Sequence, residues 1–343
     1  MQRYGMTVPF DGPLHTQRDR FTELVDLGYT DVWSAEADGH DGFTPLALAS
    51  VWAPELRLGT AIIPAFTRGP ACLAQSVGSL AQAAPGRFAI GIGTSSDVIV
   101  ERWNGIPFEE PYKKIRDMIR FLRASLDGEK IVEDYDTFSI KGFRLKAKPP
   151  EPVPIVVAAL REGMLKLAGR EGDGAIINWL SAEDVKTVAP IVHGAARAAS
   201  EEAPAPTPAG SEARERPQPR SEEREIVARI FCAPVDDPDL VYPAAKFAIA
   251  AYLNVPVYAA FHEWMGRGEQ LTPMWTKWKE GDRQGALDAI PNSLVDELIV
   301  HGPPEKCREH IQEYIANGVT TPALAPLPFG YDMEQAVRDL APR

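Results

Sequence analysis

The chain has 343 residues, of which 45% are hydrophobic, and this proportion is typical of a globular protein that buries a sizeable core. Its formal net charge of −12 argues against broad binding to nucleic acid or anionic membranes, but it is compatible with a local basic site for an anionic cofactor. No run approaches the ~18 apolar residues of a membrane span, the N-terminus is too polar for a signal peptide, and the three cysteines form neither a disulfide framework nor a metal motif, so we expect a cytoplasmic protein.

Short apolar runs alternate with helical patterns over the first third of the chain. The runs are bounded by turn residues such as glycine and proline, which is typical of buried strands. Strands are predicted at residues 4–8, 31–35, 58–63 and 88–92. Helices are predicted at residues 21–27, 43–52, 70–84 and 115–126, where apolar residues recur at intervals of three and four.

The same alternation continues in the rest of the chain, after a loosely alternating excursion at residues 134–148. Strands are predicted at residues 154–160, 174–180, 226–235 and 319–324, and helices at residues 164–168, 182–199 and 303–315. Eight strands that alternate with helices predict an α/β fold, a (β/α)8 TIM barrel with insertions, as a single domain over residues 1–343. An open doubly wound sheet is the alternative, although such a sheet usually needs fewer units.

Two segments do not follow the repeat. Residues 201–223 are rich in Ala, Pro, Glu and Arg without an apolar period, so we interpret them as a flexible, solvated insertion rather than a partner site. Residues 243–301 are helical in pattern and rich in aromatic side chains. These aromatics would fill the core and the contact between subunits, which favours a homodimer, or they would cap the barrel mouth as a substrate lid.

Two strand ends offer groups that hold anions. The loop after strand 88–92 supplies hydroxyls, backbone N–H groups and a close backbone approach, and the junction after strand 154–160 supplies a helix N-terminus with an arginine. The first corner comprises Gly93, Thr94, Ser95 and Ser96, and the second comprises Ala158, Ala159, Leu160 and Arg161. Two such corners on one barrel rim would suit a phosphorylated ribityl chain, although a pair of ordinary βα turns with a surface arginine is the alternative.

Other polar groups also follow predicted strands. Glu36, His40 and Asp41 lie in the loop after strand 31–35, where a carboxylate or a histidine is well placed for catalysis or for binding a substrate. A lone histidine in a loop is more often structural, so the carboxylates are the stronger candidates. Asn104 and Trp179 also fall just past strand ends, where they would line a substrate site or simply pack.

Four strings in order carry a resemblance to a known family. They are Gly59-Thr60-Ala61-Ile62, Arg68-Gly69-Pro70-Ala71, Gly86-Arg87-Phe88 and Gly91-Ile92-Gly93. Together they resemble the luciferase-like flavin and deazaflavin oxidoreductase superfamily. Two later strings, at residues 252–258 and 278–282, are similar to its branch of F420-dependent oxidoreductases. The resemblance implies a bacterial luciferase-like barrel that binds coenzyme F420, with FMN as the alternative cofactor.

The resemblance also implies roles for particular positions. It places the cofactor phosphate at the two corners described above. It places a bulge with a non-prolyl cis peptide at Ala61 and Ile62, where the backbone would support the back face of the ring. The sugar-phosphate dehydrogenase branch has a histidine directly after the acidic residue of the second strand, but this chain has Ala37 there. That histidine's general-base role is therefore not transferred, and His40 would have to substitute from the loop.

The implied reaction is hydride transfer between carbon 5 of the deazaflavin and a small organic substrate. One alternative is an FMN-dependent monooxygenase, which would use the same barrel, react with O2 and need a separate reductase as partner. The other is a non-catalytic protein that binds flavin or F420, which the missing histidine and the long insertion would suit. The sequence does not identify the substrate.

Overall fold

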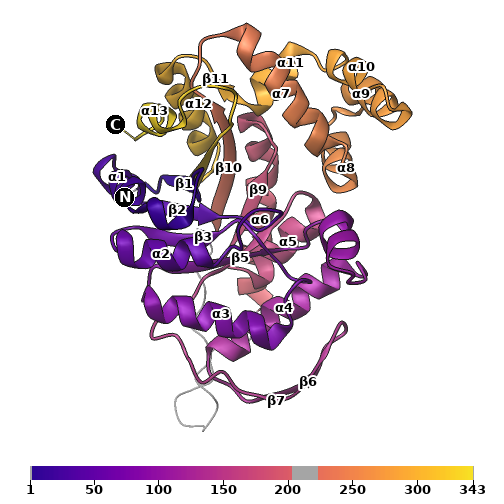
Figure 1. Ribbon diagram of the computed structural model, residues 1–343. Helices are drawn as coiled ribbons and strands as arrows, with labels where there is room; N and C mark the ends of the chain where they lie inside the picture. Colours follow the sequence, from indigo (N-terminus) through magenta and orange to yellow (C-terminus); the bar gives the residue numbers. More distant parts are fainter. Residues whose placement is uncertain (1, 203–222, 343) are drawn as a thin grey trace.

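Eight parallel strands close into a barrel in the computed structural model, which describes residues 2–202 and 223–342 (Figure 1). In chain order they are β1 (Gly5–Val8), β2 (Asp31–Ser34), β3 (Arg57–Thr60), β5 (Phe88–Gly93), β8 (Ile155–Ala158), β9 (Gly174–Asn178), β10 (Glu225–Ala233) and β12 (Thr321–Pro326). The last strand pairs with the first, through Gly5 with Ala323 and Met6 with Leu324, so the sheet has no open edge there. The predicted (β/α)8 barrel is confirmed, and the open doubly wound sheet is excluded.

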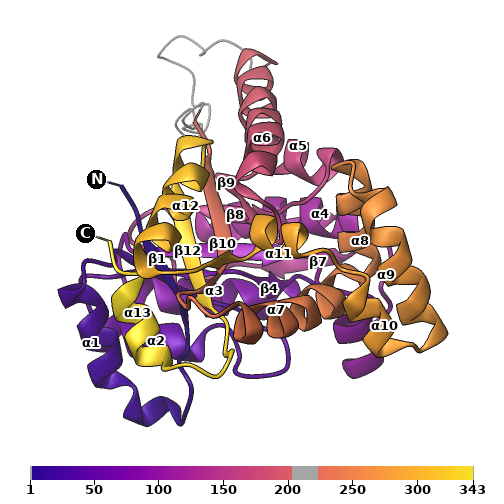
Figure 2. The ribbon, with the colours of Figure 1, turned by 90° about the horizontal axis from the view of Figure 1, so that it is seen from above.

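Helices surround the barrel on its outside, as the view from above shows (Figure 2). They are α1 (Arg18–Asp26), α2 (Thr44–Trp52), α3 (Pro70–Ala83), α4 (Pro111–Leu126), α5 (Glu162–Glu171), α6 (Ala182–Glu202), α12 (Pro304–Ala316) and α13 (Met333–Asp339). Prolines begin α3, α4 and α12, where the missing N–H costs no helical hydrogen bond. The buried face of α4 carries Ile115, Met118, Ile119 and Leu122, which repeats the predicted spacing. Of these helices, α13 was not predicted.

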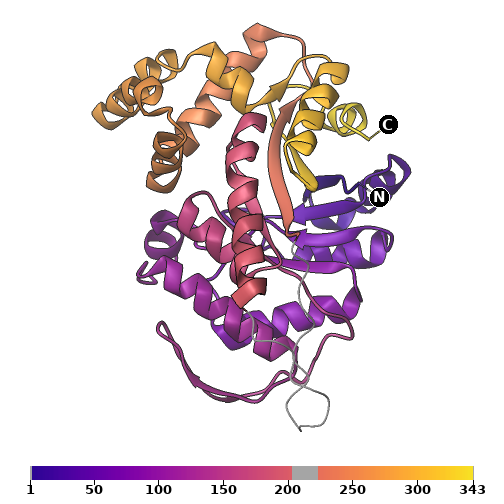
Figure 3. The same cartoon turned by 180° about the vertical axis from the view of Figure 1, so that it is seen from behind.

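Two groups of elements lie outside the repeat. The predicted excursion contains an antiparallel hairpin of β6 (Ile131–Asp134) and β7 (Ser139–Phe143) that extends away from the barrel (Figure 1). The aromatic-rich segment forms α7 (Pro238–Leu253), α8 (Pro256–Trp264), α9 (Gly268–Glu280), α10 (Arg283–Asp288) and α11 (Asn292–Leu298), which group at one side of the barrel (Figure 3). Of the proposed insertion at 201–223, residues 203–222 lie outside the described part of the chain.

Taken singly, the helices in the part of the chain that the structure describes differ from a membrane span in length or in apolar character. No single helix there has both the length and the apolar character to cross a bilayer. The pair α7 and α8, bent by 101° at its junction, passes that test by length and composition only.

A tryptophan fills the middle of the barrel. Trp33 on β2 is 1% exposed and packs with inward-facing residues of the other strands, among them Val156 and Val227. The ring fits because the two neighbouring strands carry glycine where they face it. A Cβ on Gly59 of β3 would lie 2.3 Å from Trp33 Cε3, and a Cβ on Gly5 of β1 would lie 2.8 Å from Trp33 Cδ1. The indole therefore closes the barrel interior below the C-terminal ends of the strands, where ligands bind in this fold.

We expect Gly59→Ala to lower the free energy of unfolding by about 1–3 kcal/mol, because the new methyl group would overlap the Trp33 ring. Urea denaturation measures this change. Gly194→Ala on α6 is the matched control, since its nearest neighbour would be Arg197 Nη2 at 4.0 Å and a helical alanine is favourable. Equal stability of the two variants would contradict the tight fit at Trp33.

The N-terminal end of the barrel is closed by buried charges. Arg57 forms two parallel hydrogen bonds with Glu225, at 2.6 and 2.7 Å, and an ion pair with Asp31 at 3.2 Å. The hydroxyl of Thr321 donates to Glu225 Oε1 at 2.7 Å. Each of these charged side chains has a partner of opposite charge, so we interpret the group as structural. Among the described residues, the buried side-chain atoms Asn178 Oδ1 and Arg229 Nε, which have no hydrogen-bond partner, lie farther along the strands.

Candidate active site at the C-terminal end of the barrel

The two predicted anion corners lie side by side. Strands β5 and β8 are neighbours in the barrel and pair in parallel, with Ile92 opposite Val157. A Cβ on Gly93 would lie 2.8 Å from Ala158 Cβ and 2.9 Å from Ile62 Cδ1. The structure therefore brings the first corner, the second corner and the position of the expected bulge into contact.

The first corner is a short loop between β5 and a turn of π-helix, η2 (Val98–Trp103). Its Thr94, Ser95 and Ser96 are all partly exposed. Ser95 has a φ of +62°, and Thr94 Oγ1 donates to its carbonyl at 3.2 Å. Ser96 Oγ accepts from the N–H of Ile99 at 3.4 Å. Successive hydroxyls on a left-handed turn are a suitable frame for an anion.

The second corner is the start of α5. Arg161 is the N-cap residue of this ten-residue helix; its carbonyl accepts from the N–H of Leu165 at 3.0 Å, and no side chain caps the helix. Its guanidinium is exposed and has no ion pair among the residues that the structure describes. Ala158 and Leu160 are partly exposed, and Ala159 is buried. The corner thus combines free helical N–H groups with an unpaired cation.

The expected break lies between β3 and β4 (Ile63–Pro64). The peptide bond from Ala61 to Ile62 is cis, as the resemblance implied. The N–H of Ala61 donates to Ser34 O at 2.5 Å, and the N–H of Glu36 donates to Ile62 O at 3.2 Å. Both residues border the inner cluster around Trp33. The predicted single strand at 58–63 is therefore divided in two.

The three residues of the acidic loop have different surroundings. Glu36 forms an ion pair with Arg68 and accepts from the N–H of Gly42 at 3.0 Å. Asp41 accepts from two backbone N–H groups at the start of α2, at 2.9 and 3.0 Å. Burial acts to raise its pKa, but the hydrogen bonds outweigh burial and hold the pKa below its usual value. His40 is exposed. The loop therefore brings only Glu36 to the strand end, while Asp41 caps a helix.

The two predicted substrate residues also differ. Asn104 is exposed, and its Nδ2 donates to Ile99 O at 2.7 Å, which closes the π-helical turn. Trp179 is 1% exposed and has a φ of +55°. Its ring stacks 4.1 Å from that of Phe231 and 4.8 Å from that of Tyr252, centre to centre. Asn104 thus has a local structural role, whereas Trp179 belongs to an aromatic wall at the ends of β9 and β10.

Sequence reasoning missed a polar cluster inside the barrel mouth. Asn178 on β9 and Arg229 on β10 are opposite each other in the strand register, and Asn178 Nδ2 donates to Tyr258 Oη of α8 at 3.0 Å. Asn178 Oδ1, Arg229 Nε and Thr7 Oγ1 are buried and have no hydrogen-bond partner among the described residues. A signal existed, since an asparagine and an arginine in strands that are otherwise apolar are unusual.

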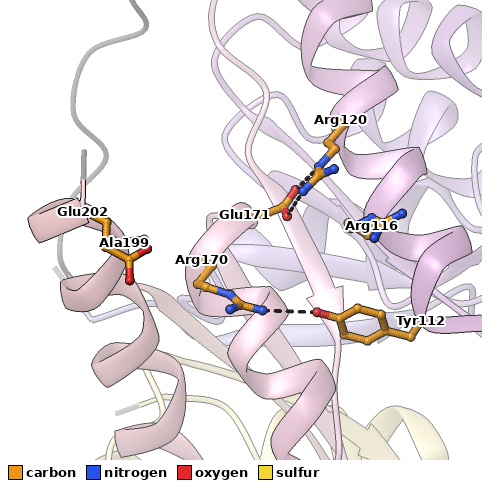
Figure 4. A pocket seen from close by; sticks show the side chains of 7 residues that line it. All are labelled: Tyr112, Arg116, Arg120, Arg170, Glu171, Ala199 and Glu202. Atoms are coloured by element: carbon orange, nitrogen blue, oxygen red, sulfur yellow. Dashed lines mark hydrogen bonds and ion pairs between the residues drawn. The ribbon is translucent and has the colours of Figure 1, made fainter. Parts of the chain in front are cut away.

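Two cavities lie on the outside of the molecule, and neither is lined by Thr7, Asn178 or Arg229. One of about 480 Å³ lies between α4, α5 and α6 (Figure 4) and is lined by Tyr112, Arg116, Arg120, Arg170, Glu171, Ala199 and Glu202. Its arginines are engaged by Glu171, Asp136 and the Tyr112 hydroxyl. A second, of about 1100 Å³, lies beside α6, α11 and α12. Within the described residues, no group of three His, Cys, Asp or Glu side chains is arranged to hold a metal ion.

Comparisons with known proteins agree on one family. The model of the luciferase-like monooxygenase family matches residues 3–321. A 5,10-methylenetetrahydromethanopterin reductase of Methanolobus tindarius is 27% identical over 322 residues, covering 91% of this chain and 90% of its own. An F420-dependent glucose-6-phosphate dehydrogenase of Kineococcus radiotolerans is 33% identical over 176 residues, covering 46% of this chain and 50% of its own. The structure of the F420-dependent tetrahydromethanopterin reductase of Methanopyrus kandleri matches with a TM-score of 0.79 at 20% identity, covering 99% of this chain and 97% of its own.

Proposed function

Since the chain belongs to the luciferase-like monooxygenase family, we propose that it is an oxidoreductase that transfers a hydride between coenzyme F420 and a small organic substrate. The relatives favour F420 over FMN. The Kineococcus dehydrogenase and the Methanopyrus reductase are both named as F420-dependent, and the Methanolobus protein is named as a methylenetetrahydromethanopterin reductase. No relative fixes the substrate, because those named act on chemically different molecules.

The contact among Gly93, Ala158 and Ile62 is the observation that supports this proposal most. Gly93 belongs to the first corner and Ala158 to the second, and both corners suit a phosphate. The same contact includes Ile62, where the backbone would support a flat ring. Asn178 Oδ1 and Arg229 Nε, two buried polar atoms without a hydrogen-bond partner in the part of the chain that the structure describes, face the same barrel mouth. Both kinds of feature fit a cofactor with an anionic tail and a polar ring.

The chain's own residues have distinct tasks in this proposal. The hydroxyls and N–H groups of residues 94–96, together with Arg161 at the start of α5, would hold the phosphate. The backbone at Ala61 and Ile62 would support the ring, and Trp33 would exclude water from below. When bound, F420 supplies a carbon that gives or takes a hydride, so the protein contributes orientation and one proton.

We also propose that the protein acts as a homodimer without a separate reductase. Phe247, Tyr252 and Trp264 on α7 and α8 are 60%, 40% and 39% exposed, which is unusual for large apolar side chains. A second copy of the chain would cover them, as the aromatic-rich sequence of this segment suggested.

We expect the purified protein to bind F420 more tightly than FMN, and fluorescence titration of each cofactor measures this. Arg161→Ser should weaken F420 binding about tenfold, because one charge-assisted contact with phosphate is lost. Arg283→Ser is the control, since Arg283 is another exposed arginine, packed 3.9 Å above the Trp278 ring outside the barrel mouth. Tighter binding of FMN, or rapid O2 consumption by the reduced protein, would favour the monooxygenase instead.

A further inference from the structure

Arg229 on β10 is partly exposed, points into the barrel mouth and has no ion pair among the residues that the structure describes. Its Cζ lies 5.0 Å from the centre of the Phe231 ring, and its buried Nε has no hydrogen-bond partner within the described residues. Arg57, which also points into the barrel, meets two carboxylates at the opposite end. Because a buried N–H group without an acceptor costs free energy, the position of Arg229 Nε indicates that a ligand supplies an electron-rich oxygen there.

Tyr258 presents a hydroxyl to the same place. Its Oη accepts a hydrogen bond from Asn178 Nδ2 at 3.0 Å, which leaves its own proton available to an acceptor. Burial raises the pKa of this phenol, against the opposing effects of the Asn178 hydrogen bond and the Arg229 charge. The phenol is therefore protonated at neutral pH and can act as a donor.

The residues first considered for catalysis differ from this pair in their surroundings. Glu36 is paired with Arg68, Asp41 caps α2, and His40 is exposed. β9 pairs with β8, and β10 pairs with β9, so Asn178 lies one strand and Arg229 two strands away from the corner assigned to the cofactor. Stacked Trp179 and Phe231 form an aromatic wall beside them.

We propose that Arg229 and Tyr258 form an oxyanion site for a carbonyl substrate, an aldehyde or ketone, with Asn178 orienting Tyr258; this assignment rests on the proposed function. In the reducing direction reduced F420, when bound, would supply the hydride for the new C–H bond at the carbonyl carbon and would itself be left oxidised. The π pair of the C=O bond moves to the oxygen, where Arg229 stabilises the charge. The oxygen then takes the proton of Tyr258, whose phenolate is reprotonated by water.

The experiment uses 4-nitrophenol, whose aromatic ring and phenolate oxygen imitate the developing oxyanion and whose visible absorption reports its ionisation. Bound to the F420-loaded protein, its apparent pKa should fall by about one unit, since hydrogen bonds to a charged oxygen contribute about 1.5–3 kcal/mol. Arg229→Met should abolish this shift, Tyr258→Phe should reduce it, and Arg229→Lys should retain most of it. Tyr242→Phe and Arg283→Met, outside the barrel mouth, should leave it unchanged.

F420 binding is measured on the same samples by fluorescence, and circular dichroism confirms that each variant is folded. If F420 binds but 4-nitrophenol keeps its solution pKa, or if Arg229→Met matches the unaltered protein, the oxyanion site is overturned while the proposed function stands. If F420 does not bind, the proposed function fails, and the titration is repeated on the protein alone. A shift that then depends on Arg229 still supports the oxyanion site, and its absence overturns it.

Discussion

Replacing Arg57 with methionine is expected to lower the free energy of unfolding by about 3–5 kcal/mol, one of the two largest effects that we predict. The guanidinium is 11% exposed and lies between Glu225, at 17%, and Asp31, at 0%. Methionine would keep much of the volume but would leave Glu225 without its ion pair and Asp31 with only the more exposed Arg3. Urea denaturation of both proteins measures the difference.

Arg3→Met is the matched control for this substitution. Arg3 contacts the same Asp31 at 3.4 Å, but its side chain is 45% exposed. We expect its removal to cost less than about 1 kcal/mol, because exposed ion pairs are well solvated in either state. If Arg57→Met were no more damaging than Arg3→Met, the buried charges would not be holding the barrel end together.

The pH dependence of the free energy of unfolding is a second test of the Arg57→Met prediction. Burial acts to raise the pKa of Glu225, but its bonds to Arg57 outweigh burial and hold the pKa below its ordinary value. A lowered pKa in the folded protein adds stability above the unfolded pKa, and this is lost as pH falls through the folded value. In the variant, burial is opposed only by the Thr321 hydrogen bond and the charge of Arg3, so the pKa of Glu225 rises and protonation relieves the buried charge. The stability difference should therefore narrow from about pH 7 towards about pH 4, and a widening would contradict this account.

The barrel was predictable from the sequence because its signals are local. Most strands are short, largely apolar runs that end at or next to glycine, proline or a polar residue, and this pattern does not depend on distant partners. The cap at α2 was equally local, since Asp41 precedes Phe43 and Thr44 in a typical helix start, although we had interpreted it as a catalytic candidate.

What the sequence did not indicate depends on pairings between distant residues. Arg57 and Glu225 are 168 positions apart, and only closure of the barrel brings them together. Asn178 meets Tyr258 across 80 positions because α8 packs near the end of β9. The corners at Thr94 and Arg161 were predicted to share one barrel rim because each follows a strand, whereas their direct contact depends on β5 pairing with β8 past the β6–β7 hairpin. The division of the strand at Ala61 came from the resemblance, not from the residue pattern.

The second large effect is expected for Gly93→Val, which should weaken F420 binding about ten- to a hundredfold. Even a Cβ at this position would lie 2.8 Å from Ala158 Cβ and 2.9 Å from Ile62 Cδ1. The added methyl groups would displace the start of the second corner, the ring support, or both, at a cost of about 1–3 kcal/mol. Fluorescence titration with F420 measures the loss.

A matched substitution separates this effect from general damage to the fold. Gly194→Val places the same side chain on α6, which is outside both corners. A Cβ there would have Arg197 Nη2, at 4.0 Å, as its nearest neighbour. This variant should leave F420 affinity unchanged. Arg161→Ser, by contrast, removes a charge without altering the contact of Gly93 with Ala158 and Ile62. Its loss of F420 affinity relative to the unaltered protein should therefore shrink at high salt, whereas the loss caused by Gly93→Val should persist. Unaltered F420 affinity in a folded Gly93→Val protein would mean that the cofactor does not bind against β5, and both corners would lose their assigned role.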